Sequence, residues 1–168
     1  MKLLTGTYVR SLDDKQRIAV PKRVRDAMGG EEITNLYLAP GTDGSLAIYT
    51  EEAFSQMANH LENGPPTGHD VRAFSRVFYA QTESVEVDRQ GRIRIPPELV
   101  ELADLRKEVV LLGVRDHLEL WDRQRWDEYL STMQTQYDSL AESAFGGGSP
   151  LRENRANAES AVAPKQPR

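Results

Sequence analysis

Apolar and polar residues alternate with a period of two in four short segments near the start and the middle of the chain. Residues 7–12 and 17–20 flank one tight turn, and residues 82–87 and 92–95 flank another. Because successive side chains of a strand point to opposite faces of a sheet, each outgoing segment has one apolar face and one polar or basic face. The pattern predicts two β-hairpins of the same kind.

The two predicted hairpins are copies of one sequence. Residues 12–21 return at a constant offset as residues 87–96, with aspartate, arginine, isoleucine and proline at matching places. A weaker echo relates residues 46–49 to residues 118–121. Two copies are too few for a solenoid, which needs several repeats to bury a continuous core. We therefore predict a pseudo-symmetric pair of units that share one core.

A short helix is expected after each of these hairpins. Pro21 and the pair Pro96 and Pro97 end the strands, and proline suits the first turn of a helix. The apolar sides of the two helices are predicted to hold Val24, Ala27 and Met28 in the first copy and Leu99, Leu102 and Ala103 in the second.

A second hairpin and a longer helix complete each copy. Further strands are predicted at residues 36–39, 46–49, 109–114 and 118–121. Thr50 and Asp122 can cap the helices that follow, since their side-chain oxygens accept from free backbone amides. The expected apolar stripes are Phe54, Met57, Ala58 and Leu61 in one helix, and Trp126, Tyr129, Leu130, Met133, Tyr137 and Leu140 in the other. Such stripes predict core or subunit contacts.

The segment between the copies is rich in turn-forming residues. A helix at residues 71–79 follows it, and Val71, Phe74, Val77 and Phe78 are expected to face inward. The chain after Phe145 has no aromatic residue and no sustained apolar period, which predicts disorder. The predicted domains are a first repeat at residues 1–62, a linker at 63–70, a second repeat with a C-terminal helix at 71–144, and a disordered tail at 145–168.

The composition limits the classes of protein to which the chain can belong. It has no cysteine, which excludes disulfides and thiolate sites and fits a reducing compartment. The N-terminal segment turns polar by Thr5 and predicts no signal peptide. No run approaches the roughly eighteen apolar residues of a membrane span. A soluble cytoplasmic protein is expected.

The net charge of −5 hides an alternating pattern. Residues 1–30 carry a balance of +4, residues 31–70 carry seven acids and no lysine or arginine, residues 71–94 carry +2, and residues 95–145 carry −6. Each of the two basic blocks holds one copy of the repeated loop. Local potential governs docking on phosphate, whereas total charge mostly sets solubility. The pattern fits either ordinary mixing of surface charge or two basic loops that approach a polyanion.

The repeated loop has the pattern Asp-x-x-x-Arg. Asp13 precedes Arg17, Asp88 precedes Arg92, and Gly91 stands before the second arginine. An aspartate at the start of a turn can accept from a backbone amide two residues on, and glycine supplies a positive φ at little steric cost. The arginine can then offer its donors to phosphate or to a guanine edge. Each pair either only holds its hairpin or also orients the arginine for DNA, and these readings are compatible.

Residues that would support an enzyme or a metal site lack the required pattern. His60, His69 and His117 show no metal-ligand spacing. Neither a nucleophile motif nor a phosphate-binding glycine loop is found. Asp13 and Asp14 are adjacent, so their side chains point apart. We predict no catalysis, no cofactor, no metal and no small-molecule substrate.

Together with the duplicated loop, two longer stretches resemble the MraZ family of bacterial transcription regulators. They are residues 74–96, FSRVFYAQTESVEVDRQGRIRIP, and residues 109–130, VVLLGVRDHLELWDRQRWDEYL. The likeness runs from about Thr5 to Ala144. The resemblance implies an α+β fold of two tandem swapped-hairpin β-barrel repeats with short helices, related by pseudo-two-fold symmetry, as in AbrB-like regulators and MazE-like antitoxins.

The resemblance also implies a function. The family binds short repeated elements of double-stranded DNA upstream of the division and cell-wall gene cluster, generally represses that cluster and its own gene, and forms homo-oligomeric rings larger than a dimer. A nucleoid-associated location follows. By resemblance, the loop arginine and acid of the family map to Arg17 and Arg92, and to Asp13 and Asp88. The neighbouring cations Lys15, Arg89 and Arg94 complete the predicted DNA-binding set.

One position departs from the family pattern, and one other function is open. Gln16 occupies the place of the usual glycine, and at a positive φ it costs about 1 kcal/mol relative to glycine. A reshaped first loop is therefore possible from the sequence. The alternative function is an antitoxin-like module that sequesters a partner protein through its C-terminal region. Anchoring aromatic residues in the tail would favour that alternative, and the tail after Phe145 has none.

Overall fold

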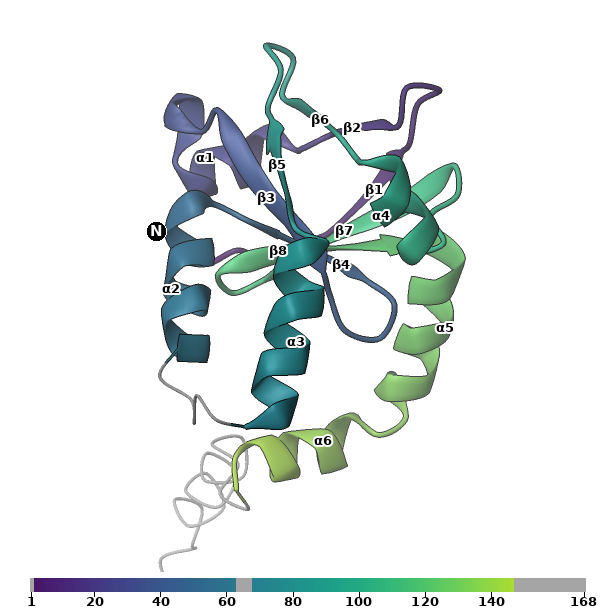
Figure 1. The fold of residues 1–168 in the computed structure, drawn as a ribbon. Coiled ribbons are helices and arrows are strands. Elements are labelled where there is room, and N and C mark those ends of the chain that lie inside the picture. The colour runs from purple at the N-terminus through teal and green to yellow at the C-terminus, as the bar shows by residue number, and fades with distance from the viewer. Residues whose placement is uncertain (1, 63–67, 147–168) are drawn as a thin grey trace, which may run out of the picture. The chain divides into compact units, whose positions relative to one another are not determined.

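A computed structural model describes residues 2–62 and 68–146 of the chain (Figure 1). The first copy consists of β1 (Thr7–Ser11), β2 (Arg17–Ala19), α1 (Lys22–Met28), a 3-10 turn (Gly30–Glu32), β3 (Asn35–Pro40), β4 (Leu46–Tyr49) and α2 (Glu51–Glu62). After α3 (His69–Ala80), the second consists of β5 (Glu83–Glu86), β6 (Arg92–Arg94), α4 (Pro97–Leu102), β7 (Glu108–Val114), β8 (His117–Asp122), α5 (Arg123–Gln134) and α6 (Tyr137–Ala144). The strands begin and end within two residues of the predicted limits.

Six strands form one antiparallel sheet in the order β1-β7-β8-β4-β3-β5. Exchanging each strand with its counterpart in the other copy reverses this order and gives the same sheet, as a pseudo-two-fold axis requires. The first strand of each copy pairs within the other copy, β1 with β7 and β5 with β3. The predicted α+β class and the swapped arrangement of the two repeats are confirmed.

The predicted closure into β-barrels is wrong for the described residues. Within residues 2–62 and 68–146, β1 and β5 are the two edges of the six-stranded sheet and do not pair with each other. The strands β2 and β6 instead form a separate antiparallel ribbon, with Ile18 opposite Ile93. Because these two short strands pair with each other, they do not close the gap between the edges.

The ribbon shares one aliphatic core with the large sheet. Ile18 and Ile93 are 1% and 0% exposed, so the inner face of the ribbon is fully buried. They pack in one cluster with side chains of the sheet and of the two short helices, among them Val24, Leu38, Ile48, Leu99, Leu111 and Leu120. Burial of this apolar surface fixes the orientation of the ribbon, since a slip of one residue would expose its isoleucines and bury its arginines.

The helices α2 and α3 lie on the face of the sheet that is turned away from the ribbon (Figure 1). Aromatic side chains fill this side. Phe54 of α2 stacks on Tyr37 of β3 with 4.6 Å between the ring centroids, and it meets Tyr49 of β4 edge-on at 5.9 Å. Phe78 of α3, which is 5% exposed, lies 6.1 Å from Phe54. Such pairs each contribute about 0.5–1.5 kcal/mol beyond burial. The sheet is therefore held from both sides.

Both predicted helix caps are confirmed. The hydroxyl oxygen of Thr50 accepts a hydrogen bond from the amide of Ala53 at 3.1 Å, at the start of α2. Asp122 Oδ1 accepts from the amide of Gln124 at 3.1 Å, at the start of α5. Asp122 is also buried and forms an ion pair with Arg106, which compensates its charge.

Three expectations about helix faces are wrong. Phe74 and Val77 of α3 are 50% and 59% exposed, although they were expected to face inward. The buried side chain of α3 is Phe78, which packs against Phe54 of α2, so this helix buries only a narrow face within the described residues. Leu102 is likewise 44% exposed, since it lies at the last residue of a helix too short to bury both of its sides. The apolar period alone does not show how wide a helix face the tertiary structure covers.

The long helix expected after Asp122 is two helices. Between α5 and α6, the amide of Gln136 donates to the carbonyl of Met133, and the hydroxyl of Thr135 donates to the carbonyl of Thr132. Both bonds have a shorter reach than the regular helical bond, and a side-chain hydroxyl that bonds the backbone competes with helix continuation. The helical spacing of the apolar residues continues across the break between α5 and α6.

The chain up to Trp126 forms one compact unit, and a second unit begins at Asp127. His69 and Asp70, which were expected in the linker, belong to α3. Most of the predicted linker and the predicted tail, residues 63–67 and 147–168, lie outside the described residues. Among the helices of the described chain, none is long and apolar enough to cross a membrane.

Candidate nucleic-acid interface

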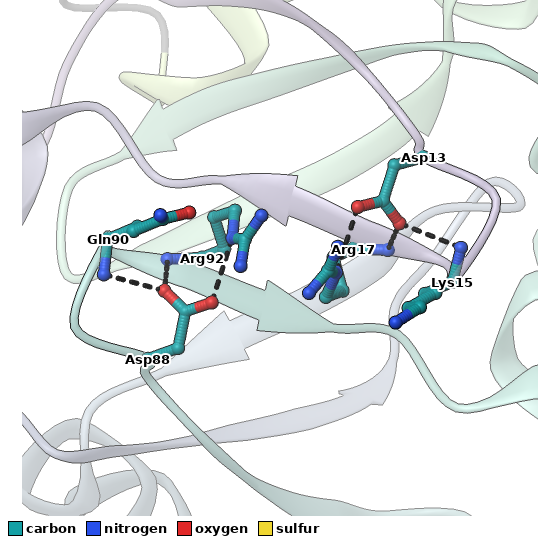
Figure 2. A network of polar contacts seen from close by, with 6 residues as sticks. All are labelled: Asp13, Lys15, Arg17, Asp88, Gln90 and Arg92. Carbon is teal, nitrogen blue, oxygen red and sulfur yellow. Dashed lines mark hydrogen bonds and ion pairs between the residues drawn. The ribbon is translucent and has the colours of Figure 1, made fainter.

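The first loop is organised around one carboxylate (Figure 2). Asp13 Oδ1 accepts hydrogen bonds from the backbone amides of Lys15 and Arg17, at 2.9 and 2.8 Å. Asp13 Oδ2 accepts from the side-chain Nε of Arg17 at 2.8 Å. The backbone closes the turn through Gln16 N to Asp13 O at 2.8 Å. A single aspartate thus fixes both the turn and the arginine that follows it.

The second loop has the same geometry. Asp88 Oδ1 accepts from the backbone amides of Gln90 and Arg92, both at 2.9 Å, and Asp88 Oδ2 accepts from Arg92 Nε at 2.8 Å (Figure 2). The side chains of Arg92 and Asp88 are 29% and 36% exposed, the same values as for the pair in the first loop. The prediction that each aspartate holds its hairpin is therefore confirmed in both copies.

The hydrogen bonds keep both carboxylates ionised. The backbone amide of Arg17 is the largest cause that lowers the pKa of Asp13, and its side chain adds to the effect. The amide and side chain of Arg92 lower the pKa of Asp88 in the same way. A charged acceptor binds the Nε of each arginine more firmly than a neutral acid would.

The ends of the two guanidinium groups remain available. In the described part of the chain, Arg17 and Arg92 bond their aspartates through Nε, and their terminal nitrogens have no hydrogen-bond partner. Those nitrogens can donate two parallel bonds to a phosphate or to the edge of a guanine. Since the aspartate already restrains the side chain, less rotamer entropy is lost when a ligand binds.

Both loops use a left-handed residue before the arginine. Gly91 has φ 73° and Gln16 has φ 58°, so the position needs a positive φ in both copies. The reshaping that the sequence left open for the first loop does not occur, because its hydrogen bonds match those of the second loop. Gln16 bears the strain of this conformation instead.

The ribbon of β2 and β6 carries one loop at each end. Its strands pair antiparallel, Arg17 opposite Arg94 and Ala19 opposite Arg92, so the loops lie at opposite ends of the ribbon (Figure 2). Side chains two residues apart share a face, which places Arg17, Arg92 and Arg94 together on the outer face, opposite the buried isoleucines. Like charges directly opposite each other weaken a sheet, so folding does not explain this arrangement.

The remaining predicted residues are exposed on the loops and the ribbon. Lys15 and Arg89 are exposed in the turns of the two loops, and Arg94 is exposed on the ribbon. Sequence reasoning missed Arg25, whose guanidinium covers Gly91 from the neighbouring helix α1. No sequence pattern indicated this contact, because Arg25 is one of several cations on α1 and Gly91 is far away along the chain. No group of three metal-binding side chains occurs among residues 2–62 and 68–146.

The fold and the site define a class of protein with two intertwined hairpin repeats that present matched Asp-Arg loops on one basic ribbon. Two stretches, residues 3–77 and 78–146, match the family model described as "MraZ protein, putative antitoxin-like". The chain belongs to the MraZ family, as the resemblance in its sequence indicated. The boundary between the two matches falls at the end of α3, which separates the two copies.

Several curated relatives carry the name "Transcriptional regulator MraZ". The protein from Finegoldia magna is 38% identical over 140 residues, which are 83% of this chain and 95% of that protein. The relative from Moorella thermoacetica is 39% identical over the same shares. That from Mesoplasma florum is 34% identical over 86% of this chain and 97% of its own length. The solution structure of PHS018 from Pyrococcus horikoshii has a TM-score of 0.33 at 14% identity, and the match covers 70% of this chain and 95% of that one.

Proposed function

We propose that this chain is a sequence-specific DNA-binding transcriptional regulator and that the β2–β6 ribbon with its two loops is its DNA-binding surface. One observation carries the proposal: Arg17 and Arg92 have their Nε atoms fixed by aspartates while their terminal nitrogens point to no protein partner in residues 2–62 and 68–146. The names of the curated relatives support the regulatory role.

The shape of the ribbon suits the major groove of DNA. The groove of B-form DNA is about 12 Å wide and admits a two-stranded β-ribbon. Arg17, Arg92 and Arg94 share the outer face, and Lys15 and Arg89 stand in the loops at its ends. The arginines are placed for base edges or phosphates, and the loop cations are placed for phosphates, which supply most of the affinity.

The role of Asp13 and Asp88 is to position the arginines. Each carboxylate would repel phosphate if it were free, but two backbone amides and one guanidinium already satisfy it. The acid therefore orients its neighbour at a small electrostatic cost. The two interpretations of the loop are therefore compatible, because the hydrogen bonds that hold the hairpin also orient the arginine.

The finer proposal concerns the target, the assembly and the parts of the chain. By resemblance to the family, the regulator is a repressor of the division and cell-wall gene cluster and of its own promoter, binds repeated elements as a homo-oligomeric ring, and is cytoplasmic and nucleoid-associated. Many weakly binding loops on one ring gain avidity on repeated sites. We retain the division into two repeats and a tail, with the tail dispensable for DNA recognition.

A second candidate is the antitoxin-like module that sequesters a partner protein. Two observations favour it: the wording of the matched family model and the exposed apolar side chains of the C-terminal helices. Tyr137 and Leu140 of α6 are 57% and 43% exposed. In that case the loops would contribute nothing to partner binding. Neither candidate involves catalysis, and the relatives' names describe regulators.

A mobility-shift titration tests the proposal. The probe is duplex DNA from upstream of the protein's own gene, and the competitor is a scrambled duplex of equal length and composition. We expect a specific shift that the scrambled duplex does not displace. Arg92→Ala is expected to abolish it or weaken it severely, and Arg17→Ala to weaken it, each flattening the slope of log affinity against log salt by about 0.9 per lost phosphate contact.

Arg76→Ala is the matched control, since it removes the same charge from an exposed residue of α3. This helix lies away from the ribbon (Figure 1). Circular dichroism confirms that each variant is folded. Wild-type protein that binds both duplexes alike, or loop variants with the affinity and salt slope of Arg76→Ala, would refute the assignment.

A further inference from the structure

Arg25 of α1 lies across the loop of the other repeat. A Cβ placed on Gly91 would come within 2.6 Å of Arg25 Nε and 2.7 Å of Nη2, so the guanidinium rests directly on the glycine. Gly91 is buried, although the residues before it in the loop are exposed. Arg25 Nε donates to the carbonyl of Val20 at 3.3 Å, and the amide of Val20 donates to Gly91 O at 2.9 Å. Arg25 is therefore held beside the second loop by backbone contacts.

Among the described residues, Arg25 has no acidic partner. Arg17 and Arg92 are paired with aspartates, and Lys22 on the same helix is paired with Asp26 at 3.1 Å. No ion pair involves Arg25 within residues 2–62 and 68–146. A half-buried guanidinium without a counter-ion can take one from a ligand, and a phosphate group supplies that charge.

In the part of the chain that the structure describes, the first loop has no equivalent of this cation. The two short helices match at the same offset as the loops: Val24 and Leu99 are both buried, and Arg25 corresponds to Val100. Val100 is a partly buried apolar side chain packed on the core. The two differences occur together. The loop that contains Gly91 is covered by Arg25, whereas the helix position that corresponds to Arg25 beside the Gln16 loop is Val100. A flat guanidinium fits over a glycine, whereas a side chain at that position would occupy the same space.

We propose that Arg25 is a further DNA-binding residue, a phosphate contact that the first repeat supplies to the loop of the second. The inference rests on the proposed function and makes the two loops unequal. The second loop presents two guanidinium groups, Arg92 aimed by Asp88 and Arg25 seated on Gly91. Beside the first loop, Arg17 has Arg94 of β6 directly opposite it, so the second guanidinium there comes from the ribbon itself.

Two variants of equal bulk separate a charge contact from a packing role. Arg25→Met keeps an unbranched stem over Gly91 and removes the charge, and Arg25→Lys keeps the charge without the guanidinium plane. On operator DNA we expect Arg25→Met to bind about ten-fold more weakly, with a salt slope flatter by about 0.9 per bound subunit. We expect Arg25→Lys to keep the slope of the wild type, and Arg76→Ala to change the affinity little.

The reverse experiment gives the first loop the missing contact. The double variant Gln16→Gly with Val100→Arg reproduces the glycine and arginine of the second loop. If it retains the wild-type melting temperature, its salt slope is expected to steepen by about 0.9 per bound subunit. The Arg25 variants decide the proposal on their own if the double variant is unstable, because neither of them alters the core.

The outcomes distinguish this inference from the proposed function. If the wild type binds the operator and Arg92→Ala abolishes binding, the function stands. Arg25→Met with the affinity and slope of Arg76→Ala would then overturn the role of Arg25 alone. Equal losses in Arg25→Met and Arg25→Lys, with an unchanged salt slope in both, would also overturn it by showing a packing role. If the wild type itself shows no specific shift, the proposed function fails first.

Discussion

At the scale of single residues, one aspartate organises each loop through three hydrogen bonds. Asp13 and Asp88 reach the same backbone positions at distances that agree within about 0.1 Å, which the matching left-handed turn makes possible. The free energy of unfolding should therefore be most sensitive to the residue before the arginine, because that residue adopts the left-handed conformation. Gln16 adopts φ 58° despite its side chain, so the network outweighs the strain of the left-handed conformation, which is about 1 kcal/mol.

The first prediction at this scale concerns Gly91. Gly91→Ala is expected to lower the free energy of unfolding by about 1–2 kcal/mol for the left-handed backbone, plus the cost of displacing Arg25. Gly30→Ala is the matched control, because Gly30 has φ 71° and an added Cβ there meets no atom within 4 Å. Urea titrations measure both. The difference should vanish in an Arg25→Ala background, and equal losses in the wild-type background would contradict the prediction.

At the scale of elements, the β7–β8 hairpin carries a histidine between carboxylates. His117 Nδ1 lies 2.8 Å from Asp116 Oδ1, and His117 Nε2 lies 3.9 Å from Glu119 Oε1. Its ring stacks on Tyr49 of β4 at 5.0 Å, and Arg115 pairs with Asp116 at 3.0 Å. Glu119 and Asp116 raise the pKa of His117 above its ordinary 6.5. The ring of His117 therefore links the hairpin to the neighbouring strand β4 through Tyr49.

The raised pKa of His117 determines how stability depends on pH. A raised pKa means that protonated His117 stabilises the folded state fully below its unfolded pKa, and that this stabilisation is lost as pH rises through the folded pKa. His117 also lowers the pKa of Glu119 and that of Asp116, so their contribution is lost as pH falls through those lower values. Unfolding measured from about pH 5 to pH 9 should show the loss in the wild type and not in His117→Gln. His60→Gln, exposed on α2, should behave as the wild type.

If His117→Gln keeps the same dependence as the wild type over that range, the titration of His117 is not its cause and the prediction is contradicted. Substituting Asp116 and Glu119 singly tests the partners, since each substitution should weaken the dependence if that carboxylate raises the pKa of His117.

At the scale of the whole molecule, exposed apolar side chains predict self-association. Phe74 and Val77 of α3 are half exposed or more, on the helix that joins the copies. Apolar surface of this kind marks an interaction site. Light scattering at micromolar concentration is expected to give a mass above that of a dimer. A mass near 18.9 kDa, that of one chain, would contradict the ring. Val77→Ser should weaken assembly, and Arg76→Ser, its exposed neighbour, should not.

Much of the fold could be predicted because it is local. The strand at Leu46–Tyr49 has the predicted limits, and the caps at Thr50 and Asp122 follow from a side-chain oxygen and an amide a few residues on. The expected inward faces of α3 and α4 were partly wrong for a physical reason. Periodicity reports which side of a helix is apolar, whereas coverage depends on elements that lie far away in the sequence.

The sequence by itself determined the duplication, the two Asp-Arg loops, the basic outer face of each outgoing strand and the family. These depend on residue identity and short spacing, which fix turns, caps and the alternation of faces. The tertiary structure decided which strands pair across the copies, that β2 and β6 form a ribbon instead of closing a barrel, and that Arg25 covers Gly91. Alternation orients a strand but does not choose its partner, since that choice is made by burying one shared core.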